Sequence, residues 1–380
     1  MAHPRTAGRS CRSHWFLIRR APLGGVLLVL ALGLLLGTAP ALAQGRAGVI
    51  VLPGARFFPE GVTVARDGSF YIGSMEEGTI ARVRPGAKEA EPFIAVGSNG
   101  LVSVLGLYAD DARGLLWACS SDAGNGKLAG SAAVGLKAFG LADGAPKGSW
   151  DLPGGGFCND LTIDPQGNVY LTDSWSPRIM RLAAGSDRLE EWARDPQLGA
   201  EQWSLNGLDF DPAARALYVV NQRAGQLFRI AVEPDGRAGA ITRIATSQEL
   251  RRPDGLKLAG PNLLATAEGG AGGMALLRLN GDSAEVTRVS EGLNGVATFA
   301  LWGNSAWIVE NQGQHFWEPD KNGRDAKPPF RLVEVALPLA AATPPSALPR
   351  TGGGLPPLLP LLLAAGLAGL AGLALRRARG

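Results

Sequence analysis

A strand–turn–strand unit recurs along this chain, and it constrains the fold more than any other feature of the sequence. The clearest copy is FCNDLTIDPQGNVYLTDS at 157–174, in which two alternating strands flank a DPQGN turn. Further copies begin at Pro59, Leu205 and Pro253. Each copy places one oxygen-bearing side chain near its start, and these four residues are Glu60, Asn159, Asn206 and Asp254.

Aligning the copies on their second strand extends the pattern to six units. The residues that enter the first strand of each unit are then Glu60, Leu105, Asn159, Asn206, Asp254 and Ala297, at intervals of 43 to 54 residues. A repeat of this length, with several strands and no helix, is typical of propeller blades. The abundance of Gly, 53 of 380 residues, also favours an all-β protein with many turns. The sequence therefore predicts an all-β fold, a six-bladed β-propeller, over residues 44–337.

The two ends of this region are predicted to close the ring. A short strand at 47–52 and a late strand at 330–336 are expected to share one blade, which removes exposed sheet edges. The alternative fold is a pair of β-sandwiches. It does not explain why the oxygen-bearing residues share one repeat position, whereas equivalent positions of a propeller's inner strands converge on a single axis.

The N-terminus has the features of a secretory signal peptide. A basic region ends in Arg19 and Arg20, an apolar run follows, and Ala41-Leu42-Ala43 forms an A-x-A cleavage site. We expect residues 1–43 to be removed. The alternative is an uncut membrane anchor, for which the apolar run is short.

The C-terminus carries a second targeting pattern. A Pro- and Ala-rich linker at 338–347 leads into LPRTG at 348–352, an apolar stretch at 355–375 and a basic tail. This order resembles the LPXTG cell-wall sorting signal of Gram-positive surface proteins. The resemblance implies that a sortase cuts between Thr351 and Gly352 and joins the protein to the cell wall. The alternative is a plain C-terminal transmembrane anchor. Either way the protein is expected to be exported and held at the cell surface, with 355–375 in the membrane.

Composition limits the partners and leaves one question open. Between the two ends, acidic residues outnumber basic ones, which argues against nucleic-acid binding. Cys119 and Cys158 are the cysteines of this region, and an exported chain permits a disulfide. They are either paired or two small buried thiols, because the sequence does not give their separation.

The four oxygen-bearing residues predict a metal site on the propeller axis. Two carboxylates and two amide oxygens, with no thiolate or imidazole, suit one divalent cation. Ca²⁺ fits best, and Mg²⁺, Mn²⁺ or Zn²⁺ are the alternatives. If each residue is considered alone, the two Asn residues are interpreted as turn caps and the two acids as solvated loop residues. Their shared repeat position favours one common site.

The motifs PEG at 59–61, ND at 159–160, NGLDFDP at 206–212 and PDGL at 253–256 resemble the SMP-30/gluconolactonase family of six-bladed propellers. The resemblance covers about residues 57 to 310. It implies that Glu60, Asn159, Asn206 and Asp254 are metal ligands and that Asp254 is also the catalytic base. The implied activity is hydrolysis of lactones or related esters, in which the cation polarises the carbonyl group.

Two residues near this site are candidates for substrate binding. Gluconolactonase-like members often have an Arg two residues before the first Asn, and this chain has Phe157 there, which favours a more apolar substrate than a sugar lactone. His315 is either a proton carrier near the channel mouth or a packing residue. The competing functional reading is a non-catalytic surface propeller with a structural metal, which binds a protein or a glycan. Phosphotriester cleavage on the same scaffold is a third possibility.

Overall fold

The computed structural model describes residues 48–199, 202–317 and 326–339, and strands dominate this region. They form four four-stranded sheets and one eight-stranded sheet. The eight-stranded sheet consists of two four-stranded units, so there are six units in all, which we call blades 1 to 6. Blade 1 contains β2 (Pro59–Val64), β3 (Phe70–Ser74), β4 (Ile80–Val83) and β5 (Glu91–Ile94). Blade 2 contains β6 (Ser103–Asp110), β7 (Leu115–Ser121), β8 (Gly135–Gly140) and β9 (Pro146–Asp151). Blade 3 contains β10 (Cys158–Ile163), β11 (Val169–Asp173), β12 (Arg178–Leu182) and β13 (Glu190–Arg194).

The remaining blades repeat this arrangement. Blade 4 contains β14 (Leu205–Asp211), β15 (Ala216–Asn221), β16 (Gln226–Val232) and β17 (Ala238–Thr246). Blade 5 contains β18 (Pro253–Gly260), β19 (Leu263–Glu268), β20 (Gly273–Asn280) and β21 (Ser283–Ser290). Blade 6 contains β22 (Val296–Trp302), β23 (Ser305–Glu310), β24 (Arg331–Ala336) and β1 (Val49–Val51). Short helical segments are Ser98–Gly100, Pro196–Leu198 and α1 (Gly313–Trp317).

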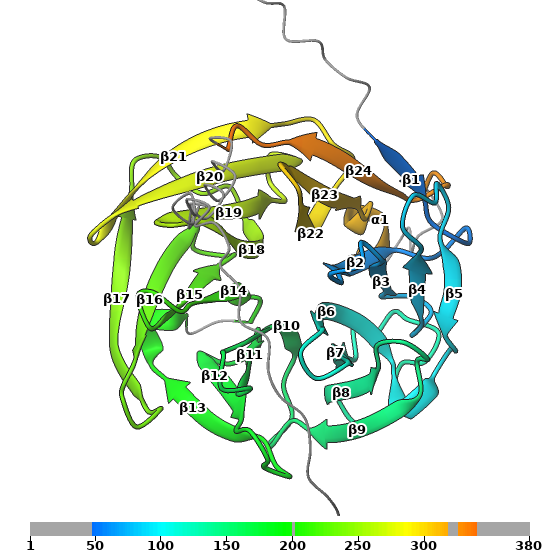
Figure 1. Ribbon diagram of the computed structural model, residues 1–380, viewed down its shortest axis with the longest axis horizontal. Coiled ribbons are helices and arrows are strands. Elements are labelled where there is room, and N and C mark those ends of the chain that lie inside the picture. Colours follow the sequence, from blue (N-terminus) through cyan, green and yellow to red (C-terminus); the bar gives the residue numbers. More distant parts are fainter. Residues whose placement is uncertain (1–47, 200–201, 318–325, 340–380) are drawn as a thin grey trace, which may run out of the picture. The chain divides into compact units, whose positions relative to one another are not determined.

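The blades are arranged around a common centre (Figure 1). The innermost strand of each blade is β2, β6, β10, β14, β18 or β22. Each inner strand contacts the next in the order β2, β6, β10, β14, β18 and β22, and β22 contacts β2 again. The strands of a blade pair antiparallel, and a short parallel ladder joins β17 of blade 4 to β21 of blade 5. The predicted all-β propeller is therefore confirmed.

The ring closes within blade 6. β1 pairs antiparallel with β24, with Val49 opposite Val333 and Val51 opposite Arg331. The early and late strands of the sequence thus share one blade, as predicted. Joining the N-terminal strand to the last blade covers an edge that would otherwise be open for pairing with another chain.

The predicted signal peptide (1–43) and sorting signal (348–380), with its membrane span at 355–375, lie outside the described residues, as does most of the linker at 338–347. Across the ranges that the structure does describe, no helix combines the length and the apolar character needed to cross a membrane.

The hydrophobic core lies between adjacent blades. Tyr170 of blade 3, for example, is fully buried and belongs to one cluster with Leu205 and Leu217 of blade 4. This packing explains the repeat pattern of the sequence, because an apolar centre in the second strand of each unit is covered by its neighbour.

A disulfide joins blades 2 and 3. Cys119 of β7 and Cys158 of β10 are bonded, with their Cα atoms 5.3 Å apart. The structure thereby decides between the two readings that the sequence left open. Because Cys158 immediately precedes Asn159, the bond also ties the start of β10 to the neighbouring blade.

Candidate functional site

Each inner strand is irregular at the same place, and that place is the aligned repeat position. The pairing of the first and second strands shifts register there in all six blades. The shifts fall between Pro59 and Val62, Val104 and Leu107, Cys158 and Leu161, Leu205 and Leu208, Pro253 and Leu256, and Val296 and Phe299. A bulge of this kind redirects a side chain away from the regular pleat and is common beside functional sites.

Glycine follows the repeat position in four blades because neighbouring inner strands approach very closely there. A Cβ atom added to Gly61 would lie 1.9 Å from the carbonyl oxygen of Leu105. One added to Gly207 would lie 2.3 Å from the carbonyl oxygen of Asp254. Only glycine allows this approach. The glycines of the PEG, NG and PDG motifs therefore bring the repeat positions of adjacent blades together.

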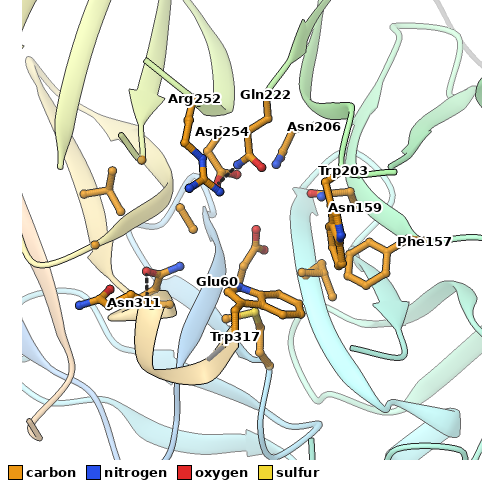
Figure 2. Close-up of a pocket in the computed structure, with 18 of the residues that line it drawn as sticks. Glu60, Phe157, Asn159, Trp203, Asn206, Gln222, Arg252, Asp254, Asn311 and Trp317 are labelled. Atoms are coloured by element: carbon orange, nitrogen blue, oxygen red, sulfur yellow. Dashed lines mark hydrogen bonds between the residues drawn. The ribbon is translucent and has the colours of Figure 1, made fainter. Parts of the chain in front are cut away.

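The six repeat positions line one cavity of about 790 Å³. Its lining includes Glu60, Leu105, Asn159, Asn206, Asp254 and Ala297. The volume lies within the usual range for small-molecule sites. Figure 2 shows the side chains of Glu60, Asn159, Asn206 and Asp254 turned toward a shared space. The structure thus brings together all four residues that the sequence selected as metal ligands.

Two carboxylate oxygens in this cavity have no hydrogen-bond partner. Oε2 of Glu60 and Oδ1 of Asp254 are buried and unpaired. The other oxygen of Asp254 accepts a hydrogen bond of 2.8 Å from Nε2 of Gln222. Asn159 donates from Nδ2 to Oγ of Ser174 at 2.8 Å, which fixes its amide and leaves Oδ1 as an acceptor. Unpaired buried carboxylate oxygens are costly unless a cation or a proton meets them.

The electrostatics of the site favour a positive charge. Burial, with repulsion from Asp254 and Asp160, raises the pKa of Glu60 well above its usual value. Burial, with repulsion from Asp160, raises the pKa of Asp254 to about 8, although the neighbouring Arg252 and the amides of Asn206 and Gln222 act in the opposite direction. In a site without a cation, these two carboxyl groups therefore resist ionisation.

A buried lysine lies near these carboxylates inside the channel. Nζ of Lys257 lies 3.3 Å from Oδ2 of Asp160, and both side chains are largely buried. Burial works against the charged amine, but Asp160 and Asp209 raise the pKa of Lys257 above its usual value. Asp209 itself accepts hydrogen bonds from the hydroxyl of Thr162 and from the backbone N–H of Leu258. Asp160, which follows Asn159 in the bulge of blade 3, is thus paired within the protein, unlike Glu60.

The donor set fits a hard divalent cation. It offers two carboxylates, of which each has an unpaired oxygen, and two amides, and oxygen ligands of this kind suit Ca²⁺ first. In the part of the chain that the structure describes, no three His, Cys, Asp or Glu side chains gather into a metal cluster. A cation in this cavity would therefore be held by the two Asn amides as well as by the two carboxylates, and an amide oxygen would hold it less strongly than a carboxylate does.

The other predicted site residues are placed differently. Phe157 lines the cavity and is buried. His315 lies on α1 and is half-buried with an unpaired Nδ1, but it is not among the residues that line the cavity, whereas its neighbours Gln314 and Trp317 are. Thr351 and Gly352, the predicted sortase cleavage residues, lie outside the described residues.

The structure adds cavity residues that the sequence analysis missed, among them Gln222, Arg252 and Asn311. One of them had a signal in the repeat. Arg252 lies two residues before Asp254, as Phe157 lies two residues before Asn159. Gln222 gave no such signal, because it follows the second strand of blade 4 and reaches Asp254 across the gap to blade 5.

Solved structures share this fold. The major allergen Mala s 1 of Malassezia sympodialis superposes with a TM-score of 0.59 at 16% identity, over 77% of this chain and 96% of that one. A gluconolactonase from Xanthomonas campestris gives a TM-score of 0.54 at 14% identity, over 77% and 90%. Regucalcin from Agrobacterium tumefaciens, a calcium-binding protein, gives 0.53 at 16% identity, over 74% and 92%. At these identities the likeness shows the fold alone.

Sequence comparison identifies the family. A search of curated protein sequences gives no significant match for this chain. The sequence pattern of the SMP-30/gluconolactonase/LRE-like region, however, matches residues 58–306, which include every inner strand from β2 to β22 and all four candidate ligands. The chain therefore belongs to the SMP-30/gluconolactonase/LRE-like family.

Proposed function

We propose that this protein is a divalent-cation-dependent hydrolase of lactones or related esters, with Ca²⁺ as the preferred ion. One observation carries the proposal: Glu60, Asn159, Asn206 and Asp254 occupy one repeat position on four blades and line a single cavity in which two carboxylate oxygens are unpaired. Family membership and the gluconolactonase and regucalcin among similar folds support the same reading.

Residues of the cavity would have distinct roles in this hydrolysis. Glu60, Asn159, Asn206 and Asp254 would hold the cation, which when bound supplies Lewis-acid stabilisation of the charge that develops on the carbonyl oxygen. Asp254 would accept a proton from the attacking water as the new C–O bond forms. It would return that proton to the alkoxide as the ring C–O bond breaks, so that a lactone and water give a hydroxy acid. The apolar walls at Leu105 and Ala297 would limit access of bulk water.

The direct test is hydrolysis of a lactone and ester panel by the full chain with added calcium or with chelator. We expect turnover with calcium, loss of at least about 100-fold on chelation, and recovery when calcium is restored. Undiminished turnover in chelator would contradict the role of the cation. Tight calcium binding with no turnover on any member of the panel would instead favour the non-catalytic propeller, in which the metal is structural and the surface binds a protein or a glycan.

We also propose that the protein is exported and attached at the cell surface. The basis is the A-x-A site at 41–43 and the LPRTG, apolar and basic order at 348–380. Thr351→Ala removes the threonine that a sortase would join to the wall, so the variant is expected to become extractable with detergent while the native chain stays wall-linked. Equal wall linkage of both forms, measured by fractionation after digestion of the wall, would rule out sorting at this motif.

A further inference from the structure

The cavity has an aromatic wall on one side. We use this name for Phe157, Trp175, Trp203 and Trp317, of which all but Trp175 line the cavity directly. Ring centroids lie 5.0 Å apart for Phe157 and Trp203, and 5.1 Å apart for Trp203 and Trp317. Phe157 is buried, whereas Trp175 and Trp317 are 37% and 36% exposed. The rings therefore form a continuous surface that runs from the interior of the cavity to its rim.

A buried ion pair fixes the deep end of this wall. The Asp173 carboxylate accepts backbone hydrogen bonds from Phe157 at 2.9 Å and from Trp175 at 3.0 Å. It also pairs with Nε of Arg178 at 2.8 Å, and Arg178 donates to the carbonyl oxygen of Gly155. Trp203 is held with a left-handed backbone, φ 64°, which is unusual for a bulky side chain. Such strain persists where the surrounding structure enforces it, and it often marks binding sites.

Arg252 lies on the other side of the cavity. Figure 2 shows its guanidinium group beside Gln222 and Asp254, away from Phe157 and Trp203. Arg252 also has a left-handed backbone, φ 53°, and it occupies the same place relative to Asp254 that Phe157 occupies relative to Asn159. Among the described residues its guanidinium group makes no hydrogen bond or salt bridge, and its charge acts on Asp254, whose pKa it lowers. A guanidinium group offers planar, paired donors that match a carboxylate.

This division of the cavity disfavours a sugar lactone. A polyol can stack a C–H face on an indole ring, but its hydroxyl groups gain no hydrogen bond from Phe157 or from the indole faces. A planar apolar group gains there instead, because it buries its faces against several rings. At the opposite side, a negative group gains an unpaired arginine.

We propose that the cavity selects a lactone or ester that has a planar apolar group on one side of its reactive carbonyl and a carboxylate on the other. The apolar group packs on the aromatic wall, and the carboxylate pairs with Arg252. This inference rests on the proposed function in one respect, namely that the ligand contains a scissile carbonyl. The two recognition contacts do not depend on hydrolysis.

The test compares three probes with the calcium-loaded full chain: γ-phenyl-γ-butyrolactone, its α-carboxymethyl derivative, in which the carboxylate lies on the other side of the carbonyl from the phenyl group, and δ-gluconolactone. We expect kcat/KM to be highest for the carboxylated lactone and lowest for δ-gluconolactone. Arg252→Gln is expected to lower the ratio of kcat/KM for the carboxylated probe over the phenyl probe by about 10- to 100-fold. The matched control is Arg251→Gln, since Arg251 pairs with Glu291 on the surface and should leave this ratio unchanged.

The aromatic wall is tested by Trp317→Leu, at the exposed end, and by Trp203→Leu. Each is expected to lower the ratio of kcat/KM for γ-phenyl-γ-butyrolactone over δ-gluconolactone by about tenfold. Trp317→Leu keeps the test valid if Trp203→Leu fails to fold. An unchanged ratio in Trp317→Leu, or δ-gluconolactone as the best of the three probes, would overturn the inference while leaving the hydrolase intact.

Binding of a non-hydrolysable probe separates this inference from the proposed function. We expect 4-phenylbutanoate to bind in calorimetry, 4-phenylbutanamide to bind at least about tenfold more weakly, and Arg252→Gln to remove that difference. If this pattern holds and no lactone is hydrolysed, the recognition contacts stand and the proposed function fails. If lactones are hydrolysed but the acid and the amide bind equally, the assignment of Arg252 is wrong.

Discussion

Replacing Asp254 by Asn is expected to weaken calcium binding at least about 100-fold and to lower lactone hydrolysis about 1,000-fold or more. The substitution keeps the shape of the side chain but removes one of the two negative charges that face the cavity. It also removes the proposed base. The measurements are calcium titration calorimetry and kcat/KM on the best lactone of the panel.

Asp235→Asn is the matched control. Asp235 lies in an exposed turn and pairs with Arg237, remote in sequence from every candidate ligand. The Asp235→Asn variant should bind calcium and turn over substrate like the native chain. Full activity in Asp254→Asn would exclude Asp254 as both ligand and base.

The same residue gives the site a defined pH dependence. In the cation-free protein the pKa of Asp254 is about 8, against 3.8 for an ordinary Asp, so the folded state retains a proton that the unfolded chain has lost. The stability that this proton contributes is fully present below about pH 4 and is lost as the pH rises toward 8. Asp254→Asn should lack this decline when the cation-free proteins are unfolded with urea at several pH values.

Cation binding should show the opposite trend. Calcium must displace the proton from Asp254, so its affinity is expected to rise by up to about tenfold per pH unit between pH 6 and 8 for each proton displaced. Calorimetry in two buffers of different ionisation enthalpy counts the protons released. A calcium affinity that is flat over this range would contradict the raised pKa of Asp254.

Lys257→Met is expected to destabilise the protein by about 3–5 kcal/mol. Lys257 lies 3.3 Å from the Asp160 carboxylate, in a largely buried pair that Asp209 flanks. Burial raises the pKa of Asp160, and Lys257 is the main group that lowers it. Without the ammonium group, Asp160 must therefore either hold a buried charge with no cation beside it or take up a proton. Urea denaturation of the native chain and the variant measures the change in the free energy of unfolding.

A double variant separates the loss of the charge pair from the loss of packing. Asp160→Asn with Lys257→Met removes both charges, so it should be less destabilised than the sum of the two single variants. Arg237→Met provides the comparison with an exposed pair and should change stability little, because solvent screens that pair. If Lys257→Met unfolds like the native chain, the pair does not stabilise the channel.

Several features of the fold and the site were predictable because they depend on local, repeated chemistry. Alternating strands and turn residues recur in every blade, so the number of blades followed from the period, and the pairing of β1 with β24 followed from the need to close the ring. The four oxygen-bearing residues were found for the same reason. Each stands at the start of an inner strand, next to the bulge that the structure shows there.

Other features depend on which side chains meet across blades, and only the tertiary structure decided them. Lys257 and Asp160 are 97 residues apart in sequence, and no local sequence pattern predicts their contact. The bond between Cys119 and Cys158 likewise required the distance between two blades. The proposed recognition contacts are of this kind too, because Arg252 and the aromatic wall come from different blades and face one another only after the ring has closed. A repeat fixes where each blade places its residues, whereas contacts across the channel arise from the packing of all six blades.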